Sequence, residues 1–276
     1  MPEVIIRPGL EEEYKKIAEV FVASFFKEPI KPERQELINS RFKKIIQKKI
    51  TSYYVVVENN EIIGLGGESC YGGVSYIGYI GVIPMHRRRG IGSFIFERIL
   101  EEAYKNNPTV HLFSNLGIEN LYRQFDFEDE HLTHILELPK FDTEIQLKVD
   151  TFESKIPSWI YELDKKAMGF DRSKLLDYLT EEQDSIIVSF ERNGYAICSD
   201  DRRIGPMIAK NKEAAKQIFD YLLLNGTKRV ITPENYMTFF TQYNPKKIQS
   251  CLKMTFGESI ESIPSWIWSY SSFASG

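Results

Sequence analysis

The sequence is poor in cysteine and histidine, the residues that form disulfides and hold zinc. Its three cysteines are odd in number and widely separated, which is typical of free thiols in a reducing compartment. The four histidines show no spacing that suits zinc. We therefore expect neither a disulfide framework nor a metal site.

Long apolar runs and a strong net charge are also absent. No stretch approaches the ~20 apolar residues that cross a bilayer, and residues 1–7 lack the apolar core of a secretory signal. These features predict a cytoplasmic protein without a membrane partner. A formal net charge of -4 argues against general nucleic-acid binding, while oligomer formation stays open.

Two common phosphate-binding motifs are missing as well. The most basic stretch, residues 87–93, reads RRRGIGS. No Gly-Lys-Ser/Thr follows it as in a P-loop, and no third glycine completes the dinucleotide fingerprint. A nucleoside triphosphatase and a nicotinamide-dependent oxidoreductase are therefore disfavoured.

This stretch nevertheless has the layout of an anion-binding turn. It follows a strand-like apolar pattern at residues 76–83 and precedes a helix-like pattern at residues 94–104. Glycines let backbone N–H groups approach a ligand, and a helix start offers unpaired donors and a positive dipole end. Arginines at a helix start are repelled by the positive end of the dipole, and a bound polyanion would offset this repulsion. The alternative is a solvated basic turn. The predicted anion-binding residues are Arg87, Arg88, Arg89, Gly90, Ile91, Gly92 and Ser93.

The apolar spacing predicts an α/β (α+β) protein with two domains, residues 1–140 and 148–276. The first half has the element order β-α-α-β-β-β-α-β-α-β, with a hairpin turn at Asn59 and Asn60. A linker is expected at about residues 140–148. The second half repeats much of this order, with a strand at 204–209, a helix at 212–224 and closing strands at 248–256 and 266–271.

One local pattern resembles a known family. The sequence Val82-x-Pro84, then Arg87-x-x-Gly90-x-Gly92, then an amphipathic helix is similar to the acetyl-CoA pyrophosphate loop of the GCN5-related N-acetyltransferases, or GNATs. The element order of the first half is also that of the GNAT fold. The resemblance implies a mixed, mostly antiparallel twisted sheet flanked by helices, with acetyl-CoA as co-substrate and no metal.

The second half looks like the C-terminal domain of tandem GNATs whose second copy has lost cofactor binding. Its strand at 205–209 stands where the strand before the phosphate loop would stand. However, no arginine and glycine loop separates this strand from the following helix. The resemblance therefore implies a degenerate GNAT-like domain that shapes the acceptor site.

The resemblance also implies roles in acetyl transfer, which needs donors for the carbonyl oxygen and an acid for the leaving thiolate. Backbone N–H groups of Gly81, Val82 and Ile83 would hold the acetyl carbonyl and pantetheine, although a merely buried strand would look the same. Tyr122 lies in a segment similar to the family's L-Y-x-x-x-G-F, with Asp126 in place of the glycine. It would protonate the thiolate; a core or surface role is the alternative.

Two further polar residues are candidates on the same resemblance. Asn115 would hydrogen-bond the pantetheine arm, or would simply form a turn. The strand at 75–82 has no carboxylate where many relatives carry a glutamate. Glu68 on the preceding strand is the predicted substitute base, acting directly or through water, and an exposed, solvated glutamate is its alternative.

The acceptor is predicted to bind where Phe25, Phe26 and Tyr71 meet the sheet, near the loop at residues 29–32. Asp171 and Arg172 would border it, although Asp171 also suits a helix cap because a helical pattern follows it.

Together these features predict an acetyl-CoA-dependent N-acetyltransferase that moves an acetyl group to a primary amine by direct attack in a ternary complex. The acceptor is a small-molecule or peptide amine, and the sequence does not choose between them. A non-catalytic acyl-CoA-binding or regulatory protein is the alternative, suggested by the missing strand carboxylate. A nucleic-acid contact through residues 86–89 is disfavoured by the acidic balance.

Overall fold

The computed structural model describes residues 4–140, 147–153, 155–181, 185–199 and 202–276. It divides into two compact units, one of residues 1–112 with Ser275 and one of residues 113–274 with Gly276. The predicted domains, 1–140 and 148–276, remain a prediction, because residues 141–146 of the expected linker lie outside the described part of the chain.

The first unit is built on a sheet of strand order β1-β2-β3-β4-β5. All neighbours are antiparallel except β4 and β5, which are parallel. Its elements are β1 (Val4–Pro8), α1 (Tyr14–Phe25), α2 (Pro32–Gln47), β2 (Ser52–Glu58), β3 (Glu61–Cys70), β4 (Val74–Val82), α3 (Ile91–Asn106) and the start of β5 (Thr109–Asn115). The predicted hairpin turn is confirmed, since Asn59 and Asn60 have φ values of 51° and 65°.

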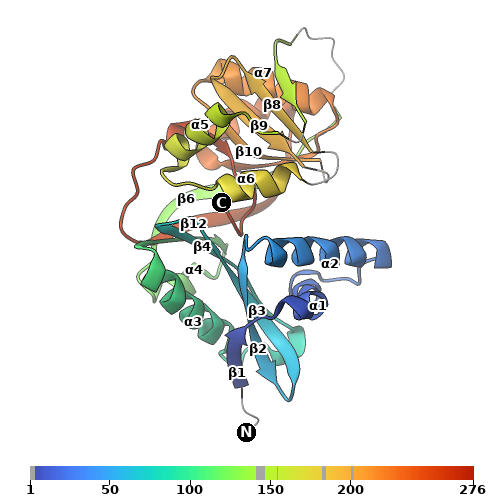
Figure 1. Ribbon diagram of the computed structural model, residues 1–276, viewed down its shortest axis with the longest axis vertical. Coiled ribbons are helices and arrows are strands. Elements are labelled where there is room, and N and C mark those ends of the chain that lie inside the picture. Colours follow the sequence, from blue (N-terminus) through green and yellow to red (C-terminus); the bar gives the residue numbers. More distant parts are fainter. Residues whose placement is uncertain (1–3, 141–146, 154, 182–184, 200–201) are drawn as a thin grey trace. The chain divides into compact units, whose positions relative to one another are not determined.

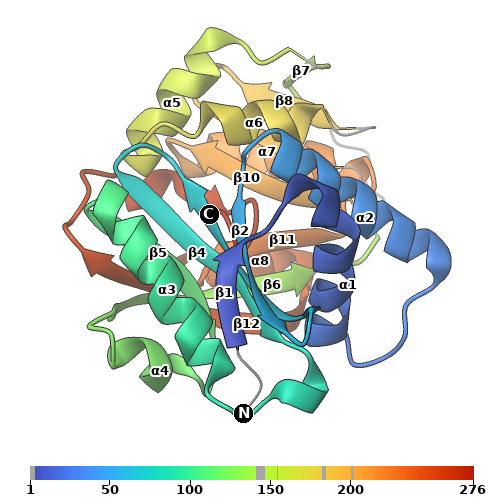
Figure 2. The ribbon, with the colours of Figure 1, turned by 60° about the horizontal axis from the view of Figure 1, so that its bottom comes forward.

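Helices cover both faces of this sheet (Figures 1 and 2). On one face, α3 packs closely because Gly66 has no side chain; an added Cβ would stand 2.4 Å from Cδ1 of Ile99. On the other face, α1 and α2 enclose a core that includes Ile17, Phe42 and Tyr53. The arrangement fixes the end of β4 against α1 and the start of α3.

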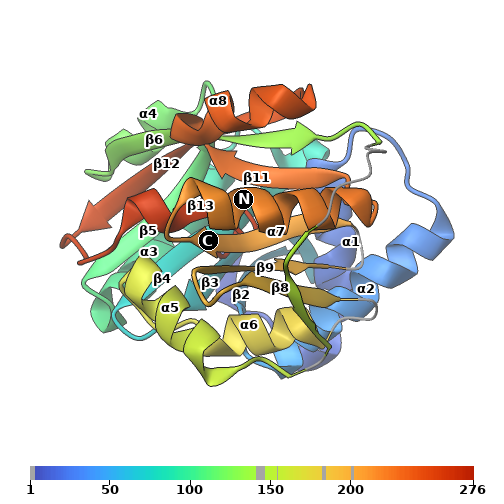
Figure 3. The same ribbon diagram turned by 90° about the horizontal axis from the view of Figure 1, so that it is seen from above.

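The second unit contains a sheet of order β5-β12-β6-β11-β10-β9-β8-β7, with β13 on β10. Its strands after β5 are β6 (Glu128–Glu137), β7 (Asp150–Phe152), β8 (Ile186–Phe190), β9 (Gly194–Cys198), β10 (Arg203–Ala209), β11 (Arg229–Pro233), β12 (Lys246–Gly257) and β13 (Ile267–Ser269). Its helices are α4 (Glu119–Arg123), α5 (Ser158–Met168), α6 (Ser173–Thr180), α7 (Lys212–Leu224) and α8 (Met237–Phe240). Helix α7 packs on β8, β9 and β10 (Figure 3).

The position of β12 in the sheet does not follow from the sequence pattern. The pattern predicts only a closing strand for the second half, yet β12 lies between β5 and β6 and pairs with β6 along most of its length. Strand β6 also pairs with β11. Because β6 has partners from late in the chain on both sides, it groups with the second unit.

The predicted fold class is confirmed: mixed, mostly antiparallel sheets flanked by helices. No helix in the described part of the chain is long and apolar enough to cross a membrane. Within the described ranges, no group of three or more His, Cys, Asp or Glu side chains is placed to hold a metal ion.

Candidate functional site

Strand β4 leaves its neighbour before it ends. It pairs with β5 from Val74↔Thr109 to Ile77↔Leu112, and no further pair joins them among the described residues. Its pairing with β3 continues to Val82. Backbone groups on the β5 side of residues 78–82 therefore become available to a ligand, in the stretch that holds the predicted Gly81 and Val82.

A bulge in β4 accompanies this separation. The register with β3 shifts between Leu65 and Gly67, opposite a region where Tyr79 has a φ of 59°. A left-handed conformation is uncommon for a tyrosine and is held here by packing, with its ring edge-on to Tyr53 at 5.3 Å. Such bulges redirect a strand and often lie next to active sites.

The glycine loop follows directly. Gly90 takes the left-handed conformation with φ 80° and begins α3 without a side-chain cap. The amide N–H groups of the first turn of α3, at Ile91, Gly92 and Ser93, have no acceptor within the helix. A Cβ added to Gly90 or Gly92 would meet nothing within 4 Å. This open helix start suits an anion.

The three arginines of the loop differ in what they bind. Arg87 donates from Nε to the carbonyl of Val82 at 2.9 Å and from Nη2 to the carbonyl of Ser24 at 2.8 Å. Arg89 forms a two-pronged pair with Glu58, and this contact lowers the pKa of that carboxyl. Arg88 is exposed, has a φ of 62° and makes no hydrogen bond or ion pair with any described residue. Arg87 and Arg89 thus shape the loop, and Arg88 is available to a ligand.

Tyr122 lies on α4 of the second unit. It is 7% exposed, and burial raises the pKa of its phenol to about 12. A phenol with this pKa keeps its proton at neutral pH and can act as an acid. Asp126, which replaces the family's glycine, has a φ of 62° and so takes the conformation that a glycine would.

Asn115, also of the second unit, is held by two residues of β12 that the sequence did not single out. Its Oδ1 accepts from Nε2 of Gln249 at 2.8 Å and from Sγ of Cys251 at 3.4 Å. Two donors on one oxygen orient the amide, which leaves the Nδ2 group to donate elsewhere. Nothing in the local sequence links Asn115 to a strand about 135 residues later.

Glu68 is buried, so the alternative of an exposed, solvated glutamate does not hold. It is 8% exposed, accepts from Oγ of Ser75 at 2.6 Å, and its pKa is raised mainly by burial. Ser75 in turn accepts from Nδ2 of Asn107, just past the end of α3. The phosphate-loop candidates lie at the opposite end of that helix. These contacts favour a structural role, and a role as base stays a prediction.

The α1–α2 connection contains a hollow of about 470 Å³. The predicted acceptor residue Phe26 lines it, together with Lys27, Glu28, Pro29, Ile30, Lys31 and Arg34. The guanidinium of Arg34 lies 4.9 Å from the centre of the Phe26 ring. Phe25 does not line the hollow, but its half-exposed ring packs against Gly81.

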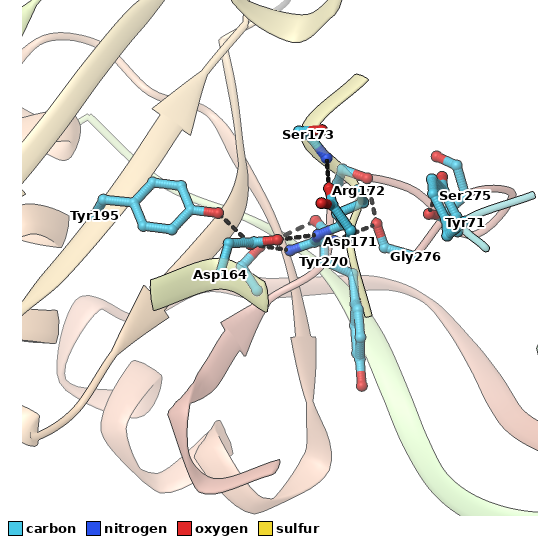
Figure 4. Close-up of polar contacts among 11 residues, drawn as sticks. Tyr71, Asp164, Asp171, Arg172, Ser173, Tyr195, Tyr270, Ser275 and Gly276 are labelled. Carbon is cyan, nitrogen blue, oxygen red and sulfur yellow. Dashed lines mark hydrogen bonds and ion pairs between the residues drawn. The ribbon is translucent and has the colours of Figure 1, made fainter. Parts of the chain in front are cut away.

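Tyr71 is buried in the first unit, where its hydroxyl donates to the carbonyl of Ser275 at 2.8 Å (Figure 4). Its backbone N–H also closes the turn before β4 by donating to Val74. The hydroxyl and the backbone N–H of Tyr71 therefore both have acceptors within the chain.

Arg172 and Asp171 have different roles in the second unit (Figure 4). Arg172 is 1% exposed and pairs through two nitrogens with Asp164, which also accepts from the hydroxyl of Tyr195. Its remaining nitrogen, Nη1, donates to the backbone oxygen of Gly276 at 3.0 Å. This burial argues against the predicted contact with an acceptor. Asp171 accepts from the N–H of Ser173, the first residue of α6, at 2.9 Å. This contact lies at the start of the helix, as the capping alternative requires, but the N-cap residue itself is Arg172.

In the second half, β10 and β11 separate as β4 and β5 do in the first half. There, another strand takes the free edge of β10. Strand β10 pairs in parallel with β11 only at Arg203↔Arg229 and Ile204↔Val230. Beyond that point β13 pairs with β10, at Met207↔Ser269 and Ile208↔Ile267. The helix that follows, α7, begins after two residues, and the Oδ1 of its N-cap Asn211 accepts from the N–H of Ala214.

Comparisons with known proteins agree with this geometry. Two models of the acetyltransferase (GNAT) domain match the chain, one over residues 49–129 and the other over residues 160–266. Together they span more than half of it. A search of curated proteins finds no match.

Solved structures share the fold. A protein from Pyrococcus horikoshii described as a candidate acetyltransferase is 26% identical with a TM-score of 0.90, covering 99% of this chain and 96% of its own. A tandem GNAT protein from the clavulanic acid biosynthesis pathway is 12% identical with a TM-score of 0.59, covering 93% and 100%. A GNAT from Kribbella flavida is 15% identical with a TM-score of 0.61, covering 92% and 71%, and like the preceding one it shares the fold. The chain belongs to the GNAT acetyltransferase superfamily and is of the tandem type.

Proposed function

We propose that the protein is an acetyl-CoA-dependent N-acetyltransferase whose acetyl site lies in the first half. The observation that carries this proposal is the free edge of β4 after Ile77, followed within a few residues by the uncapped start of α3. A free strand edge suits the amides and carbonyl of pantetheine and the acetyl group. An open helix start suits the pyrophosphate.

The residues present fit acetyl-CoA. The N–H groups of Ile91, Gly92 and Ser93, with the guanidinium of Arg88, would hold phosphate oxygens. The backbone at Gly81, Val82 and Ile83 would hold the thioester end, and Nδ2 of Asn115 would donate to the pantetheine arm. The co-substrate supplies an activated acetyl group, and the chain supplies position and hydrogen-bond donors.

We further propose direct attack by a neutral primary amine in a ternary complex, with Tyr122 as the acid. The amine nitrogen forms a bond to the acetyl carbon, the carbon–sulfur bond breaks, Tyr122 gives a proton to the leaving sulfur, and the proton that the amine nitrogen loses passes to solvent water. The raised pKa of Tyr122 keeps its hydroxyl protonated, so it can donate to the leaving sulfur. The acceptor is a small-molecule or peptide amine. Its binding site would include Phe25 and the hollow beside Phe26.

The test is release of free thiol from acetyl-CoA in the presence of a set of amines: a simple alkylamine, amino acids, a polyamine and a lysine peptide. Wild-type protein should release thiol with at least one of them. Tyr122→Phe should lower kcat by about 100-fold, in the range usual for loss of a general acid, while its affinity for acetyl-CoA stays within a few-fold of wild type.

Two outcomes would count against the proposal. If wild-type protein binds acetyl-CoA but turns over no amine, the non-catalytic acyl-CoA-binding alternative gains. If Tyr122→Phe turns over as fast as wild type, Tyr122 is not the acid.

A further inference from the structure

Ser24 has a buried hydroxyl without a partner. It lies in the last turn of α1, and its Oγ is shielded from solvent yet makes no hydrogen bond to any described residue. Serines in helices commonly bond the carbonyl four residues earlier, and Ser24 does not. Its own carbonyl, by contrast, is bound by Arg87. Such an unmet polar group lowers stability unless something else completes it.

The hydroxyl lies against the stretch of β4 that has left β5. A Cβ added to Gly81 would stand 2.8 Å from Cβ of Ser24 and 3.1 Å from its Oγ. Only glycine at position 81 allows α1 to approach the strand this closely. The unmet hydroxyl is therefore next to the backbone proposed above to hold the acetyl carbonyl.

The ring of Phe25 also packs against Gly81, beside Ser24. Its Cε2 lies 2.8 Å from where a Cβ of Gly81 would be, and the residue is 43% exposed. Phe25 itself lies outside the buried core enclosed by α1 and α2, although its ring is 5.0 Å from that of Phe21, which packs against this core. A movement of the exposed Phe25 ring would let a ligand approach Gly81 and Ser24.

We propose that Ser24 Oγ donates a hydrogen bond to the acyl carbonyl oxygen of the bound acyl thioester. This inference rests on the proposed function of the same site. A carbonyl oxygen accepts and the hydroxyl donates, so the contact would satisfy the buried group and would strengthen as negative charge develops on that oxygen during attack. Ser24 thereby adds a side-chain donor to the backbone donors of β4.

Titration with acetyl-CoA and with CoA tests the proposal without knowledge of the acceptor, because CoA lacks the acyl carbonyl. Ser24→Ala should bind acetyl-CoA about three- to tenfold more weakly than wild type, as expected for one lost hydrogen bond. Its affinity for CoA should not change. Its melting temperature should be equal or higher, because the substitution removes an unmet polar group.

Ser189→Ala is the matched control. Ser189, on β8 of the second unit, also has a buried Oγ without a hydrogen bond to the described residues. This variant should show the same change in melting temperature and no change with either ligand. Ser24→Cys keeps a side chain of similar size but donates only weakly. It should show the same ligand affinities as Ser24→Ala, and it provides a second test if Ser24→Ala does not fold.

The proposal is overturned if Ser24→Ala binds acetyl-CoA as wild type does, or if it loses affinity for acetyl-CoA and CoA equally. Failure of wild-type protein to bind either ligand would instead overturn the proposed function, and this inference with it.

Discussion

In each half of this chain, a strand that pairs with its parallel neighbour over only part of its length leads into a helix. The two halves differ in the length of the connection and in how the helix begins. In the first half, eight residues separate β4 from α3, and the helix starts at Gly90 without a side-chain cap. In the second half, two residues separate β10 from α7, and Asn211 caps the helix. One helix start is open to an anion, and the other is satisfied by its own chain.

The separated strands differ in the same sense. The edge of β4 beyond Ile77 has no strand partner in place of β5 among the described residues. The equivalent edge of β10 is paired with β13, and the N–H of Tyr270 donates to the carbonyl of Ile231 on the facing strand. We interpret the second half as a GNAT domain whose cofactor gap is closed by its own chain. The short, capped connection before α7 and the pairing of β13 with β10 are independent features. Both leave the second half without the open helix start and free strand edge of the first half.

Trp268 fixes β13 in this gap, and its removal should have the largest effect. Its Nε1 donates to the carbonyl of Ala209 at 3.0 Å, and its ring stacks on Tyr236 at 4.0 Å. Trp268→Ala should lower the free energy of unfolding by about 3–5 kcal/mol, the usual loss for a buried aromatic side chain. Chemical denaturation measures this, with the less buried Trp266→Ala as control. A loss no larger than that of the control would contradict the assigned role.

Removal of Arg172 should have an effect of similar size. It also allows a buried arginine of the second half to be compared with a more exposed arginine of the first half. Its guanidinium is buried against Asp164, so Arg172→Ala leaves a buried carboxylate without its partner. We expect a loss of about 3–5 kcal/mol in unfolding free energy. Arg89→Ala also removes a partner from a buried carboxylate, but the Arg89 side chain is 42% exposed and Glu58 keeps His86 as a neighbour at 3.0 Å, so the loss should be clearly smaller. Equal losses would show that burial does not separate the two arginines.

The cap of α7 should have a smaller effect. Asn211→Ala removes the acceptor for the N–H of Ala214 and should lower stability by about 1 kcal/mol. Asn211→Asp keeps a good cap and should stay close to wild type. Thermal unfolding measures both, and affinity for acetyl-CoA should not change in either. A change in affinity would place cofactor chemistry at α7 and contradict a single cofactor site at α3.

Local patterns predicted the parts of this structure that depend on neighbouring residues. Asn59 and Asn60 form the expected hairpin turn, and the expected helix follows the glycine loop, although it begins at Ile91 rather than at residue 94. Each of these depends on backbone preferences within a few residues.

The features that the sequence did not reveal depend on distant partners. Strand β12 reads as a strand, but its place beside β5 and β6 is set by pairing across more than 100 residues. Likewise, β13 could be expected as a strand but not as the partner of β10. Glu68 and Arg172 are charged residues in plausible positions, and only the packing around them shows that both are buried.

Titration of acetyl-CoA into wild-type protein and Gly92→Asp tests the central claim that one open site lies at the start of α3. A Cβ at this position meets no atom within 4 Å, and an acidic residue in the first turn favours the helix, so the variant should fold at least as well as wild type. Its carboxylate should repel the phosphates and weaken binding by about 100-fold or more, whereas the uncharged Gly92→Asn should lose much less. We expect one acetyl-CoA per chain in wild type and none measurable in Gly92→Asp; two per chain, or undiminished binding by Gly92→Asp, would contradict the claim.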